Sequence, residues 1–253
     1  MSIDVEAARE DTWGTGHVTH LNNAGSSLAP RPVMDTVVGH LRREEEIGGY
    51  EAAAEAEERF ESVYSSLARL IGATPGEVAV LESGSTAWAA VVSRLPLTGR
   101  RVLLGRTEYW HNVLVLRQLA RRDGLELVVL DDDAHGQMDV KHLQRELDRG
   151  GAGMVALTHV PMGGAQIQPA AEVGRACRAA GVPFVLDACQ SVGQLPLDVG
   201  TLGCDVLVGT GRKFLRGPRS CTRTAGTAAS RARRLSARAA TRSRIGSSPR
   251  SRA

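Results

Sequence analysis

Short apolar runs alternate with amphipathic segments along most of the chain. Apolar runs bounded by turn residues predict strands at VAVLES (78–83), RRVLLG (100–105), LELVVLD (125–131), MVALTHV (154–160), PFVLDA (183–188) and DVLVGT (205–210). Between them, apolar residues recur at helical spacing over 84–95, 112–124, 138–150 and 170–181. This alternation predicts an α/β fold of three layers, in which helices cover both faces of a mostly parallel sheet.

The N-terminal part has a different pattern. Residues 30–73 have helical periodicity interrupted by Gly48 and Gly49, which predicts two amphipathic helices. We therefore expect an N-terminal segment with helices (1–75), an α/β domain (76–219) and a separate tail (220–253). The tail contains only Leu235 and Ile245 as large apolar residues. Because so little apolar surface could be buried there, we predict that it is disordered.

Charge also separates the tail from the body. The chain has 31 Lys and Arg against 28 Asp and Glu, a formal net charge of +3. Nine arginines follow Arg219 and no acidic residue does, so the body has 22 basic and 28 acidic residues. Nucleic-acid binding would rest on the tail alone, which offers no aromatic ring for base stacking. We therefore do not favour a nucleic-acid partner.

Other classes of protein are disfavoured by what the sequence does not contain. The four cysteines form no CxxC pair, so neither a zinc site nor a disulfide framework is indicated. The N-terminus is polar and acidic, and no apolar run approaches the roughly 18 residues of a membrane span. We expect a cytoplasmic protein without membrane attachment.

The most informative polar residues follow the last two predicted strands. Asp187 and Gln190 form a D-x-x-Q motif, and Lys213 follows in GTGRK. A carboxylate beyond a buried strand can keep a pyridine nitrogen protonated, and a lysine across the same crevice can form a Schiff base. Taken singly, Asp187 could be a helix cap and Lys213 a solvated lysine. Together they favour a site for pyridoxal 5'-phosphate (PLP).

A second motif, GSTAW (84–88), lies where a strand gives way to a helix. The backbone N–H groups there, with the hydroxyls of Ser85 and Thr86, could receive a phosphate at the positive end of the helix. Alone the motif is weak, because Ser and Thr at a helix start are usually caps. Its value comes from the other two motifs.

From HLNNAGSSLAPRPV at His20 to GTGRKFLRGPR ending at Arg219, the chain carries a series of such motifs. In these motifs and in their order along the sequence, the chain resembles the class V aminotransferase family. These are fold-type I PLP-dependent enzymes. The motif sequences are most similar to the group that contains ergothioneine C–S lyases, isopenicillin N epimerase-like proteins and cysteine desulfurases. The resemblance implies the large domain of a PLP transferase, a small amino-acid substrate and a homodimer.

Residue roles follow from this resemblance. It implies that Lys213 forms the Schiff base, that Asp187 pairs with the ring nitrogen and that Gln190 approaches the ring hydroxyl. The implied phosphate contacts are Ser85, Thr86, Thr210 and Arg212, the last of which stands where many relatives have histidine.

Two other regions are also matched by position. Tyr109 falls on the ring-stacking position, with Trp110 or His111 as alternatives if the loop is shifted. Asn22 and Asn23 match the substrate-side N-terminal segment. Met162 departs from the pattern, because desulfurases have asparagine near the ring at this position.

In relatives, GTGRKFLRGPR leads into a glycine-rich strand of the large domain and later a small C-terminal domain. Here we expect both to be absent, because the Arg/Ala/Ser-rich tail has the composition of a frameshift or an equivalent truncation. The sequence therefore predicts a PLP-dependent lyase, transaminase or epimerase that uses Lys213, or alternatively an inactive remnant of one. A desulfurase is disfavoured, because its nucleophilic cysteine would lie in the replaced part.

Overall fold

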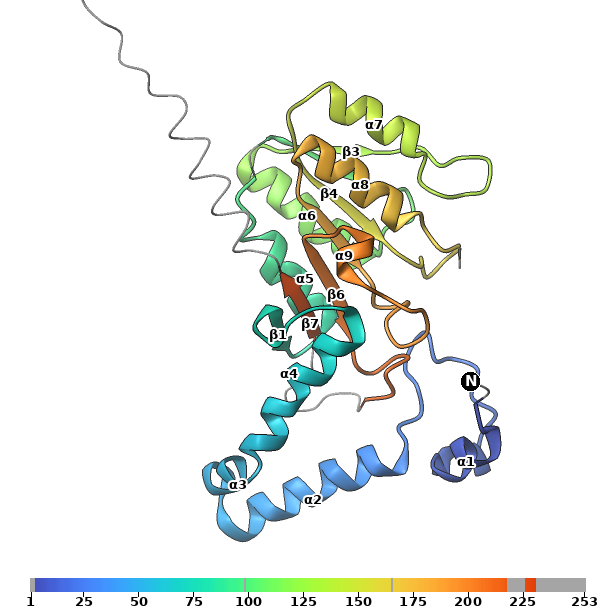
Figure 1. Cartoon of the computed structure of the whole chain (residues 1–253), viewed down its shortest axis with the longest axis vertical. Coiled ribbons are helices and arrows are strands. Elements are labelled where there is room, and N and C mark those ends of the chain that lie inside the picture. Colours follow the sequence, from blue (N-terminus) through green and yellow to red (C-terminus); the bar gives the residue numbers. More distant parts are fainter. Residues whose placement is uncertain (1–2, 98, 165, 218–225, 231–253) are drawn as a thin grey trace, which may run out of the picture.

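The computed structural model describes residues 3–97, 99–164, 166–217 and 226–230, with side chains for all but the last segment. Its described residues form a seven-stranded sheet (Figure 1). The strands lie in the order β1 (Val78–Leu81), β7 (Gly226–Ser230), β6 (Val206–Thr210), β5 (Phe184–Asp187), β4 (Ala152–Thr158), β2 (Arg101–Leu104) and β3 (Glu126–Val129). Strands β6, β5, β4, β2 and β3 are parallel, whereas β7 is antiparallel to both of its neighbours.

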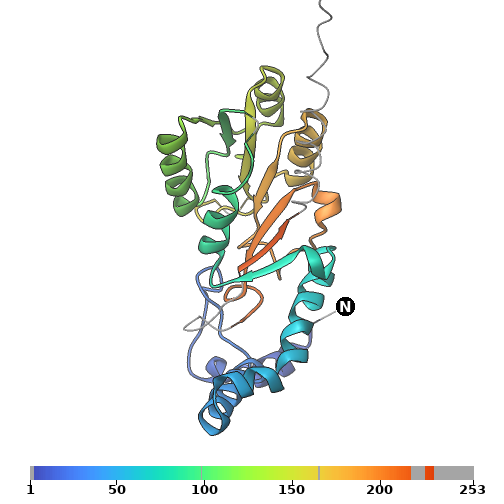
Figure 2. The ribbon, with the colours of Figure 1, turned by 90° about the vertical axis from the view of Figure 1, so that its left-hand side faces the viewer.

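Helices cover both faces of this sheet, which confirms the three-layer fold that the sequence predicts. Helices α5 (Gly84–Val92) and α6 (Trp110–Asp123) pack on one face. Helices α7 (Val140–Asp148), α8 (Ala170–Ala180) and α9 (Val199–Leu202) pack on the other (Figure 2). Strand β4 is buried throughout. Met154 and Ala156 belong to the apolar cluster under α5 and α6, and Val155 and Leu157 belong to the cluster under α7, α8 and α9. A strand buried on both faces explains why its sequence is a continuous apolar run.

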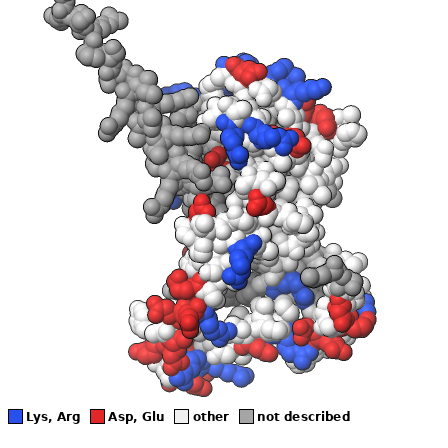
Figure 3. Space-filling view, in the orientation of Figure 1, with Lys and Arg blue, Asp and Glu red and all other residues white. Residues whose placement is uncertain are grey.

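The N-terminal residues form an arm of helices below the sheet in Figure 1. It comprises α1 (Val5–Glu10), η1 (Trp13–Gly16), α2 (Arg31–Ile47), α3 (Gly49–Glu55), α4 (Glu57–Ile71) and η2 (Pro75–Glu77). The predicted break lies at Gly48, whose φ of +97° suits glycine, and Ala56 adds a second break before α4. Charged side chains of both signs gather over this arm (Figure 3).

One segment of the predicted tail, 220–253, differs from the expectation. Disorder is the wrong prediction for Gly226–Ser230, because these residues form β7 between β1 and β6. The expectation that the strand after GTGRKFLRGPR is missing is wrong for the same reason. Backbone pairing with β1 and β6 holds this strand, and such pairing does not require large apolar side chains. GTAAS contains none, so the apolar pattern could not predict the strand. The remainder of the predicted tail, 231–253, lies outside the described residues.

The parallel strands place their polar ends together. Thr158 ends β4, Asp187 ends β5 and Thr210 ends β6, and all three side chains are buried. Thr158 pairs in register with Asp187, and Asp187 pairs with Val208 on the next strand. The carboxyl edge of the sheet therefore brings together residues that are far apart in the sequence. In the part of the chain that the structure describes, no helix is long and apolar enough to cross a membrane.

Candidate active site

Asp187 lies at the centre of this edge. Its Oδ2 accepts a hydrogen bond from Asn112 Nδ2 at 2.7 Å, and its Oδ1 accepts one from the Cys189 backbone N–H at 2.9 Å. The side chain is only 5% exposed. Because both oxygens are held by fixed donors, the carboxylate has a defined orientation before any ligand arrives.

Lys213 lies just beyond the end of β6 and is partly buried. Burial lowers the pKa of its amine, and the charge of Arg212 lowers it further, while Cys189 and Asp187 act in the opposite direction. Asp187 ends β5 and Lys213 follows the end of β6, which pairs with β5 in the sheet, so both residues lie at the same edge. A lower pKa increases the fraction of neutral amine, which is the nucleophilic form.

Gln190 has the most revealing environment of the residues in D-x-x-Q. Its Nε2 donates to the Ala24 carbonyl oxygen at 3.1 Å. Its Oε1 is buried and has no hydrogen-bond partner among the described residues. A buried acceptor without a donor is costly unless a ligand supplies one. A hydroxyl on a bound ring would do so, and the residues present therefore fit PLP.

The start of α5 lies against this turn. A Cβ at Gly84 would come within 2.7 Å of Cys189 Sγ and 3.2 Å of the Gly209 carbonyl oxygen, so the close approach requires glycine. GSTAW, DACQ and GTGRK are thereby brought together, as the sequence predicts. Ser83 caps the helix by accepting from the Thr86 N–H at 3.1 Å, and its Oγ lies 3.0 Å from Thr86 Oγ1.

The other predicted phosphate contacts lie on the neighbouring strand and loop. Ser85 is partly buried, Thr86 is exposed and Thr210 is 4% exposed at the end of β6. Arg212 Nη1 donates to Thr210 Oγ1 at 3.4 Å. Hydroxyls, a cation and a helix N-terminus are the groups that a phosphate prefers.

The three candidate stacking residues cluster at the start of α6. Ring centroids of Tyr109 and Trp110 are 5.6 Å apart, and those of Tyr109 and His111 are 6.5 Å apart. The Tyr109 N–H donates to Thr158 Oγ1 at 3.2 Å, which ties this residue to the sheet edge. Trp110 is exposed.

The N-terminal segment returns to the site from a distant part of the sequence. Ala24 accepts from Gln190, and the Ser27 N–H donates to the Arg212 carbonyl oxygen at 2.9 Å. The neighbouring Asn22 and Asn23 are exposed, and Asn22 Oδ1 accepts from the Gly25 N–H at 3.1 Å. Met162 is also exposed.

Three residues without an assigned role connect these parts. Glu108 Oε1 accepts from the Thr158 N–H at 2.6 Å, and its Oε2 accepts from Thr158 Oγ1 at 2.7 Å. Burial, followed by the charge of Asp187, raises the pKa of Glu108 to about 7, against the hydrogen bonds from Thr158 and Asn112. Glu108 precedes α6, which begins at Trp110, whereas Asn112 lies within that helix, so no single helical pattern in TEYWHN signalled that they meet.

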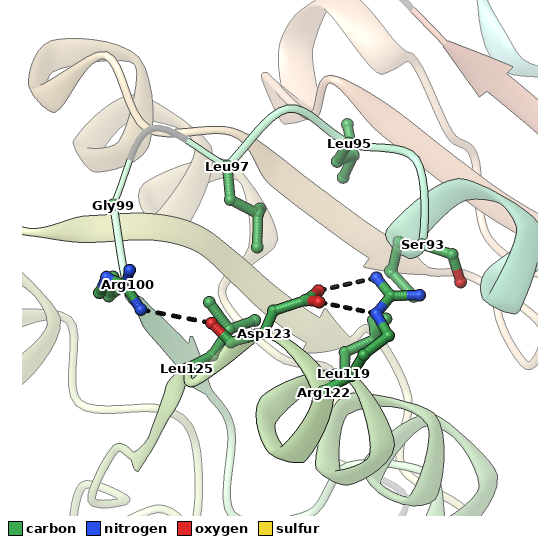
Figure 4. A pocket seen from close by; sticks show the side chains of 10 residues that line it. Ser93, Leu95, Leu97, Gly99, Arg100, Leu119, Arg122, Asp123 and Leu125 are labelled. Carbon is green, nitrogen blue, oxygen red and sulfur yellow. Dashed lines mark hydrogen bonds and ion pairs between the residues drawn. The ribbon is translucent and has the colours of Figure 1, made fainter.

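A hollow of about 510 Å³ lies between the loop that leads into β2 and the end of α6 (Figure 4). Leu97, Leu119 and Leu125 line it, and its charged groups are already paired. Arg122 meets Asp123 at 2.7 Å, and Arg100 donates to the Asp123 and Gly124 carbonyl oxygens. Neither Asp187 nor Lys213 lines this hollow.

The layered fold and the residues at its carboxyl edge define the large domain of a PLP-dependent transferase. Residues 19–222 match the family model described as "Aminotransferase class-V". The chain belongs to this family, whose members depend on PLP. The family expectation of the sequence is thereby confirmed.

Individual relatives agree with this assignment. A probable cysteine desulfurase of Pyrococcus abyssi is 29% identical over 219 residues, 84% of this chain and 54% of the relative. The apo structure of a cysteine desulfurase from Thermococcus onnurineus NA1 has a TM-score of 0.80 at 26% identity, covering 91% of this chain and 57% of that one. A C-DES mutant with glycine linked to its PLP cofactor has a TM-score of 0.80 at 22% identity, covering 90% of this chain and 60% of that one, and shows the fold alone. The chain thus spans little more than half the length of these proteins.

Proposed function

We propose that this chain binds PLP at the carboxyl edge of its sheet and acts at the α-carbon of an amino acid through Lys213. The observation that carries the proposal is the Gln190 side chain, whose buried Oε1 has no donor among the residues that the structure describes. PLP would supply an aldehyde for an amine and a ring that accepts electrons. Within this proposal, 1–75 and 76–219 are the N-terminal segment and the cofactor-binding domain.

Each residue contributes a separate physical effect. Asp187 offers a fixed carboxylate to a protonated ring nitrogen, and Gln190 orients the ring through its hydroxyl. Lys213 Nζ, with its lowered pKa, can attack a carbonyl carbon and can later accept or return the proton of the α-carbon. The start of α5, with Ser85, Thr86, Thr210 and Arg212, would hold the phosphate, and Tyr109 would stack on the ring.

Among the reactions open to such a site, we propose cleavage of a C–S bond, because the relatives are named as cysteine desulfurases. Elimination from cysteine consumes one water and yields pyruvate, ammonia and hydrogen sulfide. Transfer of sulfur to a cysteine of the described part is less favourable. Burial raises the pKa of the Cys177 and Cys189 thiols, which leaves little nucleophilic thiolate.

The chain makes an unusually clear labelling test possible. It contains two lysines, Lys213 and the exposed Lys141 on α7. The full chain with added PLP should develop a visible absorption band, and borohydride reduction followed by peptide mapping should place the label on Lys213. Lys213→Ala should remove both signals, whereas Lys141→Ala should leave them unchanged.

Two outcomes would contradict parts of this proposal. No band, or a label on Lys141 alone, would show that the site does not bind the cofactor as proposed. A label on Lys213 without pyruvate or sulfide from cysteine, and without product from other amino acids, would favour the alternative of an inactive remnant that keeps its cofactor site.

A further inference from the structure

The hydrogen bonds behind Asp187 lead to a second carboxyl group. Asn112 lies on α6, is 1% exposed, and donates from Nδ2 to Asp187 Oδ2. A hydrogen bond from its side chain also lowers the pKa of Glu108, which lies four residues earlier, just before α6 begins. Glu108 is in turn held at both oxygens by Thr158, the residue in register with Asp187 on the next strand. One amide therefore lies between two carboxyl groups.

An asparagine side chain is well suited to position 112, between the two carboxyl groups. An asparagine NH₂ group carries two N–H donors, one for each carboxyl, and it neither gains nor loses a proton near neutral pH. A carboxylate at residue 112 would add a third acceptor, and an apolar side chain would leave Asp187 Oδ2 without its donor. The amide thus couples the charge and orientation of the two acids.

We infer that Glu108 is a positioning residue that acts through Asn112 on Asp187 and adds negative charge behind the carboxylate that meets the ring nitrogen. The inference rests on the proposed function, because it concerns the same cofactor site. It assigns a role to a buried acid that the binding residues themselves do not explain.

The electrostatics of the site support this role. With a pKa of about 7, Glu108 changes its charge close to neutral pH. The charged group that acts on it is Asp187 at the end of β5, and the other titratable groups near the ends of the neighbouring strands are Cys189 beyond β5, Arg212 and Lys213 beyond β6, and His159 beyond β4. Burial lowers the pKa of His159. A cationic ring nitrogen at Asp187 would favour ionised Glu108, so ligand binding near pH 7 should release a proton from Glu108.

The test uses two ligands that cannot react with Lys213. The first is 4-deoxypyridoxine 5'-phosphate, which has no aldehyde, and the second is its analogue with carbon in place of the ring nitrogen. Calorimetric titration of the full chain at pH 7, in two buffers with different ionisation enthalpies, gives the affinity and the protons released. Only the first ligand carries the charge that Glu108 is inferred to sense.

Glu108→Gln keeps the shape of the side chain and removes its charge. We expect it to weaken binding of the nitrogen ligand about tenfold, the scale of one charge acting across a partly polar site, and to change the carbon ligand less than twofold. Proton release with the nitrogen ligand should fall as well. The matched control, Glu45→Gln on the exposed face of α2, should change neither affinity.

Equal losses for both ligands would overturn the inference, because they would indicate general damage to the site. Unchanged binding of the nitrogen ligand would overturn it too. Wild-type protein provides a second measurement if the variant does not fold: the nitrogen ligand must release more protons than the carbon ligand, and equal release contradicts the inference. If wild-type protein binds neither ligand, the proposed cofactor site itself fails.

Discussion

Two glutamates near opposite ends of the parallel strands have opposite electrostatic environments. Glu146, on α7, meets the guanidinium groups of Arg101 and Arg149, and these contacts lower its pKa against the effect of burial. Glu108 accepts from the hydroxyl and N–H of Thr158 and has a further hydrogen bond from the Asn112 amide, yet burial raises its pKa to about 7. Cationic partners compensate the charge of a buried carboxylate, whereas a buried carboxyl without them keeps the desolvation cost of ionisation.

The difference separates a structural ion pair from a candidate functional group. Arg101 also donates to the Glu146 and Gly150 carbonyl oxygens at 3.2 Å, so the cluster at β2 and α7 is closed on itself. The carboxyl edge instead contains a buried acceptor, Gln190 Oε1, that has no donor among the described residues. It also contains a carboxyl group, Glu108, whose pKa is raised to about 7. Unsatisfied polar groups and displaced pKa values concentrate where a ligand is to be bound.

The largest predicted effect concerns stability at alkaline pH. The pKa of Glu108 is raised from 4.5 to about 7, so its contribution is fully present below pH 4.5 and is lost as the pH rises through 7. The stability of Glu108→Gln relative to wild type should therefore rise by about 3 kcal/mol between pH 4.5 and pH 8. Urea denaturation of both proteins at the two pH values measures this, and parallel pH profiles would contradict it.

Sequence patterns predicted the layers of the fold but not every strand. The apolar runs at 154–160 and 183–188 correspond to β4 and β5 because burial on both faces demands apolar side chains. Gly226–Ser230 was missed because its pairing depends on backbone groups that any sequence possesses. A strand of this kind can only be recognised from the neighbours that it joins.

The candidate site was likewise only partly accessible from the sequence. Asp187, Gln190 and Lys213 were identifiable because each lies in a motif next to a predicted strand end. The roles of Asn112 and Thr158 depend on the register between β4 and β5 and on the direction in which α6 leaves the edge. Neither is encoded in local spacing, so this part of the site required the three-dimensional arrangement.

A smaller effect of opposite sign is expected at Glu146. Its depressed pKa means that its contribution is present above pH 4.5 and is lost as the pH falls through its value in the folded protein. Glu146→Gln should lower the melting temperature by a few degrees at pH 7 and reduce the acid sensitivity of the fold. Differential scanning calorimetry from pH 7 down to pH 3 measures both. Affinity for 4-deoxypyridoxine 5'-phosphate should not change, and a loss like that of Glu108→Gln would remove the distinction between the two acids.

The smallest effect should appear at Lys213 itself. Burial lowers the pKa of this amine and Asp187 opposes that shift, so Asp187→Asn should lower the pKa further. Competitive acetylation of the Lys141→Ala background, followed by mass spectrometry across pH 6 to 10, reports the titration of Lys213 alone. Its midpoint should move to lower pH in Asp187→Asn and stay in place in Glu146→Gln. Equal shifts would mean that Lys213 senses the net charge of the protein, whereas a shift confined to Asp187→Asn would show that the carboxyl edge acts as one electrostatic unit.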